Sequence, residues 1–230
     1  MMKCLSEQRT IIITGASGSI ASGLISRFIE LGDKLILIYR VFTEEYNSIK
    51  KKYPEQIFGI ESDLKNLSEI QSKLDNTIAD NKLNPGFLIH TAAMRSIDFS
   101  SLADGEPQIW YDVIENNLII TYHILRCSIE ILRRNGFGRI VLFGSNVSRI
   151  GLGNGSAYSA SKAAIANLCR SVACEEAENN ILINTISPGP VKIDDSKFNP
   201  EYREFRKQYY DDQLKRIPLN RLADVDDIFN

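Results

Sequence analysis

Short apolar runs alternate with helical patterns along this chain, and this alternation constrains the fold more than any other feature. Six apolar runs have the length and composition of buried strands, at residues 10–14, 35–39, 57–60, 87–90, 139–143 and 181–186. Helical patterns fill the intervals, at residues 19–31, 43–53, 67–78, 109–134 and 157–177. Strands connected in this way pair in parallel through right-handed crossovers, and their helices cover both faces of the sheet. The sequence therefore predicts an α/β fold with a doubly wound parallel sheet.

The size and composition of the chain limit what such a fold can do. A length of 230 residues suits one domain, so we expect residues 1–230 to form a single unit. The net charge of −2 gives no basis for nucleic-acid binding, and no apolar run is long enough to predict a membrane span. The four cysteines lack the spacing of metal ligands and only two histidines are present, so we expect no metal site. Free thiols then predict a cytoplasmic protein.

A glycine-containing loop follows the first predicted strand. Its candidate contact residues are Gly15, Ser17, Gly18, Ser19 and Ile20, and the first helical pattern begins within it. Glycines let the backbone approach a pyrophosphate, and the N-terminus of a helix favours anions. A tight turn without a ligand also fits a glycine pattern. The position after the first strand of a strand–helix–strand unit nevertheless favours a dinucleotide phosphate site.

The ends of the second and third predicted strands bear on the choice of dinucleotide. The second ends in Tyr39 and Arg40, without an acidic residue. An acid at this place binds the ribose 2′-hydroxyl of NAD, whereas an arginine suits the 2′-phosphate of NADP. The sequence thus favours NADP, with NAD as the alternative if Arg40 is only a solvated strand end. Asp63 is a candidate acceptor for the adenine amino group, or else an ordinary turn or capping residue.

The last long helical pattern carries Tyr158 and Lys162, whose four-residue spacing stacks them on one helix face. An ammonium beside a phenol favours the phenolate and lowers its pKa, which suits proton transfer near neutral pH. Ser145 precedes this pair and supplies a hydroxyl that can polarise a carbonyl oxygen. A Tyr-x-x-x-Lys pair alone also fits the solvated face of an alanine-rich helix, so its weight depends on the rest of the chain.

Taken in order, these residues resemble the short-chain dehydrogenase/reductase family over nearly the whole chain. The matching positions are the 14–21 loop, residues 62–64, Asn117, Ser145, Tyr158, Lys162, Asn184 and residues 188–191. The resemblance implies a Rossmann-type three-layer sandwich. It also implies that Tyr158 is the general acid/base, that Lys162 lowers the pKa of Tyr158 and holds the nicotinamide ribose, and that Ser145 orients the substrate oxygen. Asn117 would support a water relay to Lys162.

The same resemblance implies contacts with the cofactor. Residues 17–20 would line the phosphates, Asp63 and Leu64 the adenine, and Ala92 and Ala93 the adenosine side. Pro188, Gly189 and Val191 would line the nicotinamide. The implied activity is that of an NAD(P)-dependent oxidoreductase, which transfers a hydride between nicotinamide and a carbonyl or alcohol carbon of a small molecule.

Two other functions fit parts of the sequence. The loop spacing Gly-x-x-Gly-x-x-Ala and the segment at residues 90–93 resemble sugar-nucleotide epimerases and dehydratases, although the chain lacks their large C-terminal domain. A non-catalytic nucleotide-binding protein of the same fold is the second alternative. The intact set of Asn117, Ser145, Tyr158 and Lys162 argues against it.

Three further expectations concern the last part of the chain and its assembly. Residues 194–215 are charged and rich in aromatic residues, which predicts a substrate lid, and two amphipathic helices at the edge are compatible with it. The family's final strand has no counterpart after the helical pattern at residues 221–228. The helices at 109–134 and 157–177 carry more apolar or small residues than one sheet-facing stripe requires, which predicts a homodimer through them.

Overall fold

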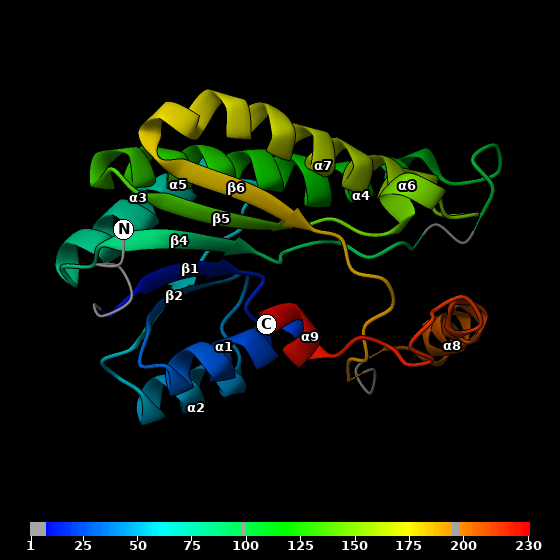
Figure 1. The fold of residues 1–230 in the computed structure, drawn as a ribbon, viewed down its shortest axis with the longest axis horizontal. Coiled ribbons are helices and arrows are strands. Elements are labelled where there is room, and N and C mark those ends of the chain that lie inside the picture. The colour runs from blue at the N-terminus through cyan, green and yellow to red at the C-terminus, as the bar shows by residue number, and fades with distance from the viewer. Residues whose placement is uncertain (1–7, 98–99, 195–197) are drawn as a thin grey trace.

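The computed structural model describes residues 8–97, 100–194 and 198–230, and its centre is a six-stranded parallel sheet (Figure 1). The strands are β1 (Thr10–Thr14), β2 (Lys34–Tyr39), β3 (Ile57–Glu61), β4 (Pro85–His90), β5 (Gly138–Phe143) and β6 (Ile181–Ile186). Their spatial order is β3-β2-β1-β4-β5-β6, which is the Rossmann order. This order confirms the predicted doubly wound sheet. No strand follows β6 in the described part of the chain, as the sequence predicted.

Helices cover both faces of the sheet (Figure 1). One layer contains α1 (Ser19–Glu30), α2 (Glu44–Lys52) and the short α9 (Val225–Phe229), which packs on α1. The opposite layer contains α3 (Leu67–Asp80), α5 (Ile120–Asn135) and α7 (Ser156–Glu176). None of the helices in the described ranges combines the length and apolarity that a membrane span requires.

The two layers enclose separate hydrophobic cores because successive residues of a strand face opposite sides of the sheet. Ile12 of β1 packs in the core under α3, α5 and α7, whereas Ile11 and Ile13 pack in the core under α1 and α2. All three side chains are almost fully buried. This double burial explains why the strands are continuous apolar runs rather than alternating ones.

Several elements differ from the sequence prediction. The single helix expected at 109–134 is α4 (Pro107–Ile114), a π-helical segment (Glu115–Ile119) and then α5. A π-helical turn needs tertiary contacts to hold it, which helical periodicity does not reveal. β4 begins at Pro85, two residues before the strand expected at 87–90, and a short helix α6 (Val147–Ile150) follows β5 unpredicted.

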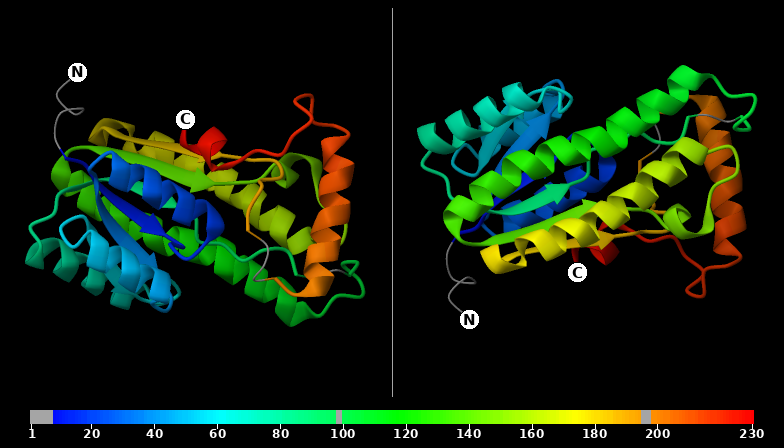
Figure 2. Two further views of the ribbon diagram at one scale, coloured as in Figure 1. Left: turned by 90° about the horizontal axis from the view of Figure 1, so that it is seen from below. Right: turned by 90° about the horizontal axis from the view of Figure 1, so that it is seen from above.

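The segment predicted as a lid contains one helix, α8 (Pro200–Leu214), rather than two. Asn199 caps it by accepting a hydrogen bond from the Tyr202 backbone at 2.8 Å, and Pro200 stands at its first turn. Figure 2 shows α8 crossing the end of the molecule beyond the carboxyl ends of the strands. Residues 195–197, which belong to the predicted lid, lie outside the described residues.

Candidate active site

A cavity of about 460 Å³ opens at the carboxyl ends of the strands. β1 pairs with both β2 and β4, and the chain leaves in opposite directions on the two sides. Open parallel sheets bind ligands at such a switch point. The predicted cofactor residues that line this cavity are Gly15, Ser17, Gly18, Arg40, Asp63, Leu64, Ala92 and Ala93.

The loop between β1 and α1 fits a pyrophosphate. Gly15 has a φ of +65°, and a Cβ added there would lie 2.6 Å from the Ala92 backbone nitrogen. The N-terminus of α1 has no side-chain cap and no acidic residue in its first turn, so its N–H groups can meet an anion. Ser19 and Ile20 are the first residues of that turn. They are not among the residues that line the cavity.

The side of the cavity formed by the ends of β2 and β3 contains both basic and acidic side chains. Arg40 is exposed at the end of β2, and Asp63 accepts a hydrogen bond from the Lys65 backbone at 3.0 Å. The Leu64 carbonyl accepts one from His123 Nδ1 at 2.8 Å, which fixes this turn against α5. The cavity is also lined by residues that were not among the predicted contacts, namely Ile38, Tyr39, Ser62, Lys65, Thr91, Met94, Asp112, Asn116 and Ile120. For Lys65, Thr91 and Met94, nearness to a strand end was the available signal.

Tyr158 and Ser145 meet near the N-terminus of α7. Ser145 follows β5, and Tyr158 lies in the first turn of α7. Burial raises the pKa of Tyr158 to about 12, and the nearby Ser145 hydroxyl acts in the opposite direction. The phenols of Tyr202, Tyr209 and Tyr210 raise that pKa further, which places α8 beside the pair.

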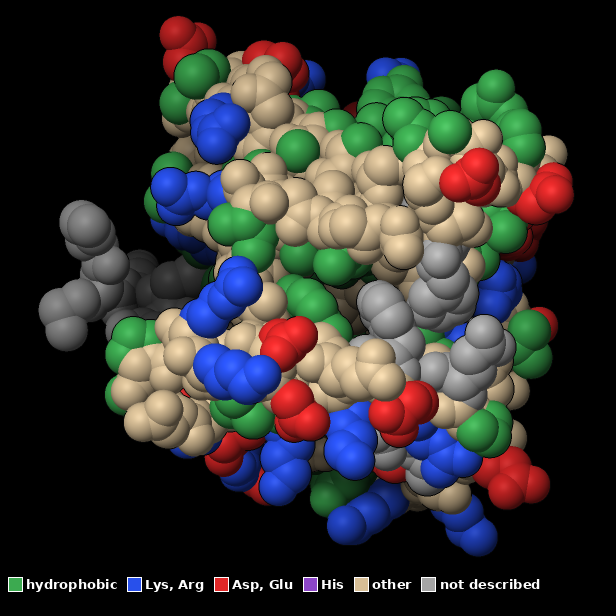
Figure 3. Space-filling model, turned by 90° about the vertical axis from the view of Figure 1, so that its right-hand side faces the viewer, with side chains coloured by type: hydrophobic (Ala, Val, Ile, Leu, Met, Phe, Trp, Pro, Cys, Tyr) green, Lys and Arg blue, Asp and Glu red, His purple; other side chains and the backbone are tan. Residues whose placement is uncertain are grey.

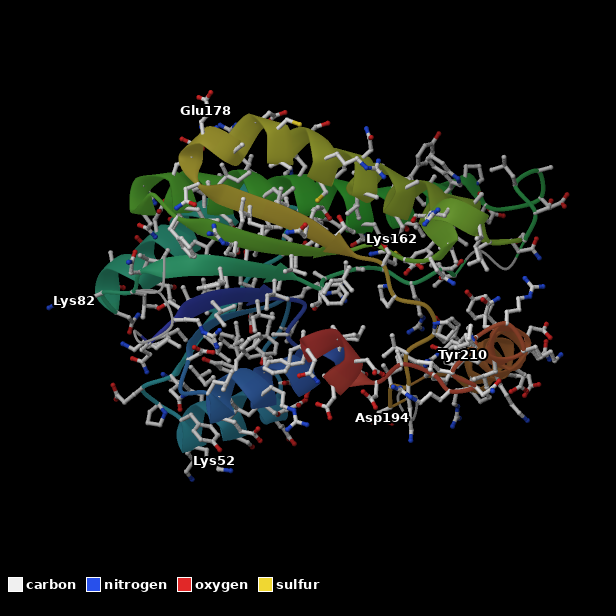
Figure 4. The ribbon with its side chains drawn as sticks, viewed as in Figure 1. Lys52, Lys82, Lys162, Glu178, Asp194 and Tyr210 are labelled. Carbon is white, nitrogen blue, oxygen red and sulfur yellow. The ribbon has the colours of Figure 1, made fainter. Side chains whose placement is uncertain are left out.

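Lys162 stands one helical turn beyond Tyr158 and is almost fully buried. Its Nζ donates to the Phe143 carbonyl at 2.8 Å and lies 5.7 Å from the centre of the Tyr158 ring. Burial lowers the pKa of Lys162 to about 8. The structure therefore brings the two side chains together, and burial is the largest cause of both pKa shifts. Figure 4 shows Lys162 at the ends of β5 and β6.

Asn117 is buried in the π-helical segment and connects two parts of the site. Its side-chain oxygen accepts from the Met94 backbone at 2.8 Å, and its Nδ2 donates to the Met94 carbonyl and to Ser161 Oγ, both at 3.1 Å. Ser161 Oγ in turn donates to the Tyr158 carbonyl at 2.8 Å. Asn117 thus ties the segment after β4 to the turn of α7 that carries Tyr158.

His90 at the end of β4 is structural in this geometry. Its Nδ1 lies 2.7 Å from Thr14 Oγ1 and its Nε2 lies 2.9 Å from Thr121 Oγ1. Burial lowers the pKa of His90 to about 3, so the ring is neutral at physiological pH. Both ring nitrogens are used inside the fold, which leaves none for a substrate.

The segment after β6 lies beside Ser145 rather than in the cavity. The Pro188 carbonyl accepts from the Asn146 backbone at 3.1 Å, next to Ser145. Val191 pairs with Ala223, and its carbonyl accepts from the Tyr210 hydroxyl at 3.2 Å. This segment therefore connects the turn at Ser145 to α8, although Pro188, Gly189 and Val191 do not line the 460 Å³ cavity.

Comparison with known proteins identifies this arrangement. The family model described as short chain dehydrogenase matches residues 9–203. The chain belongs to the short-chain dehydrogenase family. It is 27% identical over 226 residues to a 3-oxoacyl-[acyl-carrier-protein] reductase FabG of Buchnera aphidicola, covering 97% of this chain and 88% of that relative.

Solved structures share the fold of this family member. ElxO with NADPH bound superimposes with a TM-score of 0.85 at 19% identity, covering 97% of this chain and 89% of that one. NAD+-bound xylitol dehydrogenase gives a TM-score of 0.82 at 22% identity, covering 96% and 89%. The chain is an NAD(P)-dependent oxidoreductase of this family. Neither the epimerase or dehydratase nor the non-catalytic alternative is favoured.

Proposed function

We propose that the protein transfers a hydride between NADP(H) and the carbonyl or alcohol carbon of a small molecule, with Tyr158 as the general acid/base. One observation carries the proposal: Tyr158 lies beside the Ser145 hydroxyl and the buried ammonium of Lys162, at the same edge of the sheet as the cavity at the switch point. Proton donor, hydroxyl and cation are the groups that a carbonyl reduction needs.

Each side chain has a separate task. The bound nicotinamide supplies or accepts the hydride. Ser145 donates a hydrogen bond to the substrate oxygen, and Tyr158 gives that oxygen its proton in reduction and removes it in oxidation. Lys162, with a pKa of about 8, keeps a positive charge near the phenol at neutral pH and stabilises the phenolate that reduction leaves. Asn117 holds Tyr158 in place through Ser161.

Tyr158→Phe tests this assignment because it removes only the phenolic oxygen. The variant is expected to bind NADPH with nearly the parental Kd and to lose roughly 10²- to 10⁴-fold in kcat, the usual contribution of a general acid. Cofactor fluorescence gives the Kd, and NADPH absorbance gives the rate. Parental kcat in this variant would refute Tyr158 as the proton donor.

The preference for NADP rests on Arg40, which lines the cavity from the end of β2. Arg40→Asp is expected to raise the Kd for NADPH at least 10-fold and to leave that for NADH equal or lower, because it replaces a partner of the 2′-phosphate by a like charge. The control is Lys51→Asp, an exposed charge reversal on α2. If the ratio of the Kd values for NADPH and NADH is the same in Arg40→Asp as in the parent, Arg40 is a surface residue without a role in cofactor choice.

The remaining features of the proposal concern the whole chain. We assign residues 1–230 to one NAD(P)-binding domain in which the segment 194–215, with α8, serves as the substrate lid. The hydrogen bond from the Tyr210 hydroxyl to the Val191 carbonyl supports this assignment, because it joins α8 to the segment beside the catalytic residues.

A cytoplasmic location is supported by Cys127, Cys169 and Cys174, which are free thiols. Assembly as a homodimer is part of the same proposal.

A further inference from the structure

Arg206 on α8 is buried to an extent that is unusual for arginine, with only 6% of its surface exposed. Its Nη2 donates to the Tyr210 hydroxyl at 2.5 Å. Its Nη1 is buried and has no hydrogen-bond partner. Among the described residues, no carboxylate forms an ion pair with it.

Aromatic rings surround this guanidinium. Its Cζ lies 5.0 Å from the centre of the Phe198 ring and 4.7 Å from that of Tyr210. Such cation–π contacts offset part of the cost of burying the charge. They leave an N–H donor unsatisfied, and a buried charge is normally paired with a counter-ion. The guanidinium therefore carries a charge without a counter-ion and a donor without an acceptor in the part of the chain that the structure describes.

A second arginine joins the same aromatic cluster from another part of the fold. Arg95, in the segment after β4, places its Cζ 4.8 Å from the Phe198 ring centre and 4.3 Å from that of Tyr202. Arg95 is exposed, whereas Arg206 is buried. One guanidinium thus lies inside the cluster, and another lies at its surface.

The cluster is next to the reaction site. The Tyr210 hydroxyl bridges Arg206 and the Val191 carbonyl, with Tyr210 donating to Val191 at 3.2 Å. Tyr210 also acts on the pKa of Tyr158. Figure 4 shows Tyr210 and Lys162 at the same end of the molecule.

The other basic residues of α8 behave differently. Arg203 and Lys207 are exposed on the helix. Figure 3 looks onto this end of the molecule and shows basic and acidic side chains together on its outer surface. Burial among aromatic rings therefore distinguishes Arg206 from its neighbours on the same helix.

We propose that Arg206 binds an acid group of the substrate, so that the enzyme acts on carbonyl or alcohol compounds that carry a carboxylate or a phosphate. The planar guanidinium suits both groups, and Arg95 adds a second cation at the surface of the cluster. This inference rests on the proposed function, since it concerns the substrate of the same site. A neutral substrate would leave the buried Nη1 without a partner.

Matched substrate pairs test the proposal on the full chain. The pairs are acetoacetate and methyl acetoacetate, levulinate and methyl levulinate, and dihydroxyacetone phosphate and dihydroxyacetone, each with NADPH and with NADH. The parent is expected to favour the anionic member of at least one pair by 10-fold or more in kcat/KM. Arg206→Met should lower kcat/KM for that anion about 10- to 100-fold, the usual effect of losing a charge-assisted hydrogen bond.

Neutral substrates and a second variant exclude a general defect. Arg206→Met should keep kcat/KM for the neutral member within 3-fold, and its Kd for NADPH should stay parental. Arg203→Met removes the same charge from the exposed face of α8 and should leave kcat/KM for both members of the pair unchanged. An equal loss for both members would make Arg206 structural, and a weakened Kd for NADPH would assign its charge to the cofactor phosphates. Either result overturns the proposal.

A binding experiment covers the case in which none of these compounds is turned over. Succinate, glutarate and inorganic phosphate are titrated by calorimetry into the protein saturated with NADPH. Binding to the parent that Arg206→Met abolishes supports the site, whereas no binding to the parent, or binding retained in the variant, overturns it. Failure of the proposed function gives a different result, namely parental kcat in Tyr158→Phe.

Discussion

Burial shifts the pKa values of Tyr158 and Lys162 in opposite directions. It raises that of Tyr158 to about 12 and lowers that of Lys162 to about 8, because it disfavours the charged form of each group. At neutral pH the phenol is therefore protonated and ready to donate, while the ammonium keeps its charge. Reduction of a carbonyl suits this state directly. Oxidation of an alcohol requires the phenolate, so its rate should increase with pH.

The cost of keeping Lys162 charged gives a stability prediction. Its folded pKa of about 8 lies below its ordinary value of 10.5, so the unfolded state binds more protons between these values and the parent gains stability as pH rises through that window. Lys162→Met lacks the buried ammonium, although it leaves the Phe143 carbonyl without its donor. We expect this variant to exceed the parent by roughly 1–2 kcal/mol in free energy of unfolding at pH 7.

Urea unfolding at pH 7, 8.5 and 10 measures the difference. The difference in free energy of unfolding between Lys162→Met and the parent should shrink as pH rises, because the parent lysine becomes neutral at a lower pH in the folded state than in the unfolded state. Lys51→Met, at an exposed position of α2, should show no such trend. A difference that stays constant from pH 7 to 10 would show that charge at Lys162 does not limit stability.

At the scale of elements, the sequence revealed what local patterns encode. The strands, α1, α3 and α7 follow from apolar runs and helical periodicity, and the loop at Gly15 follows from its place after β1. The π-helical segment does not, because it is held by the pairing of Asn117 with Met94, which lies far away in the sequence. The pKa of Tyr158 likewise responds to the tyrosines of α8, whose approach no local pattern encodes.

The glycine loop gives a prediction that separates backbone strain from close contact. Gly15 and Gly32 both have positive φ, at +65° and +83°, but an added Cβ would meet Ala92 at Gly15 and nothing within 4 Å at Gly32. Gly32→Ala is expected to cost about 1 kcal/mol of folding stability and to leave cofactor binding unchanged. Gly15→Ala should cost roughly 2–3 kcal/mol and raise the Kd for NADPH at least 10-fold, because Ala92 must move in the wall of the cavity.

Thermal unfolding and NADPH titration of both variants measure these effects. The comparison is direct because each variant adds one methyl group at a left-handed glycine. Equal stability losses with parental NADPH binding in both would show that the approach of Gly15 to Ala92 has no role in the cofactor site.

At the scale of the whole molecule, the alternation of strands and helices predicted a doubly wound parallel sheet, and a cavity opens at the carboxyl ends of its strands. The buried cation of Arg206 could not be predicted in this way. Its neighbours come from α8 and from the segments after β4 and β6, and the sequence of α8 shows only one basic residue among several. Which of them is buried depends on how α8 lies across the strand ends (Figure 2).

Assembly is the last prediction, and it belongs to the layer formed by α4, α5 and α7. α4 packs along α7, and the outer surface of this layer exposes Tyr111 by 63% and Tyr122 by 47%. α7 adds Ala160 and Ala163 as exposed small residues, which allow another helix to approach closely. Apolar and small residues exposed together favour a partner, and a symmetric copy of the same surface is the commonest one.

Light scattering at micromolar concentration is expected to give the mass of a homodimer for the parent. Tyr122→Arg should shift the protein to monomer because it would bury a like charge from each copy in the interface. Leu31→Arg exchanges an exposed apolar residue in the opposite layer, 59% exposed at the end of α1, and should remain dimeric. A monomeric parent would refute the dimer. If Leu31→Arg abolishes the dimer and Tyr122→Arg does not, the interface lies in the layer of α1, because an added charge disrupts the dimer only where the two copies touch.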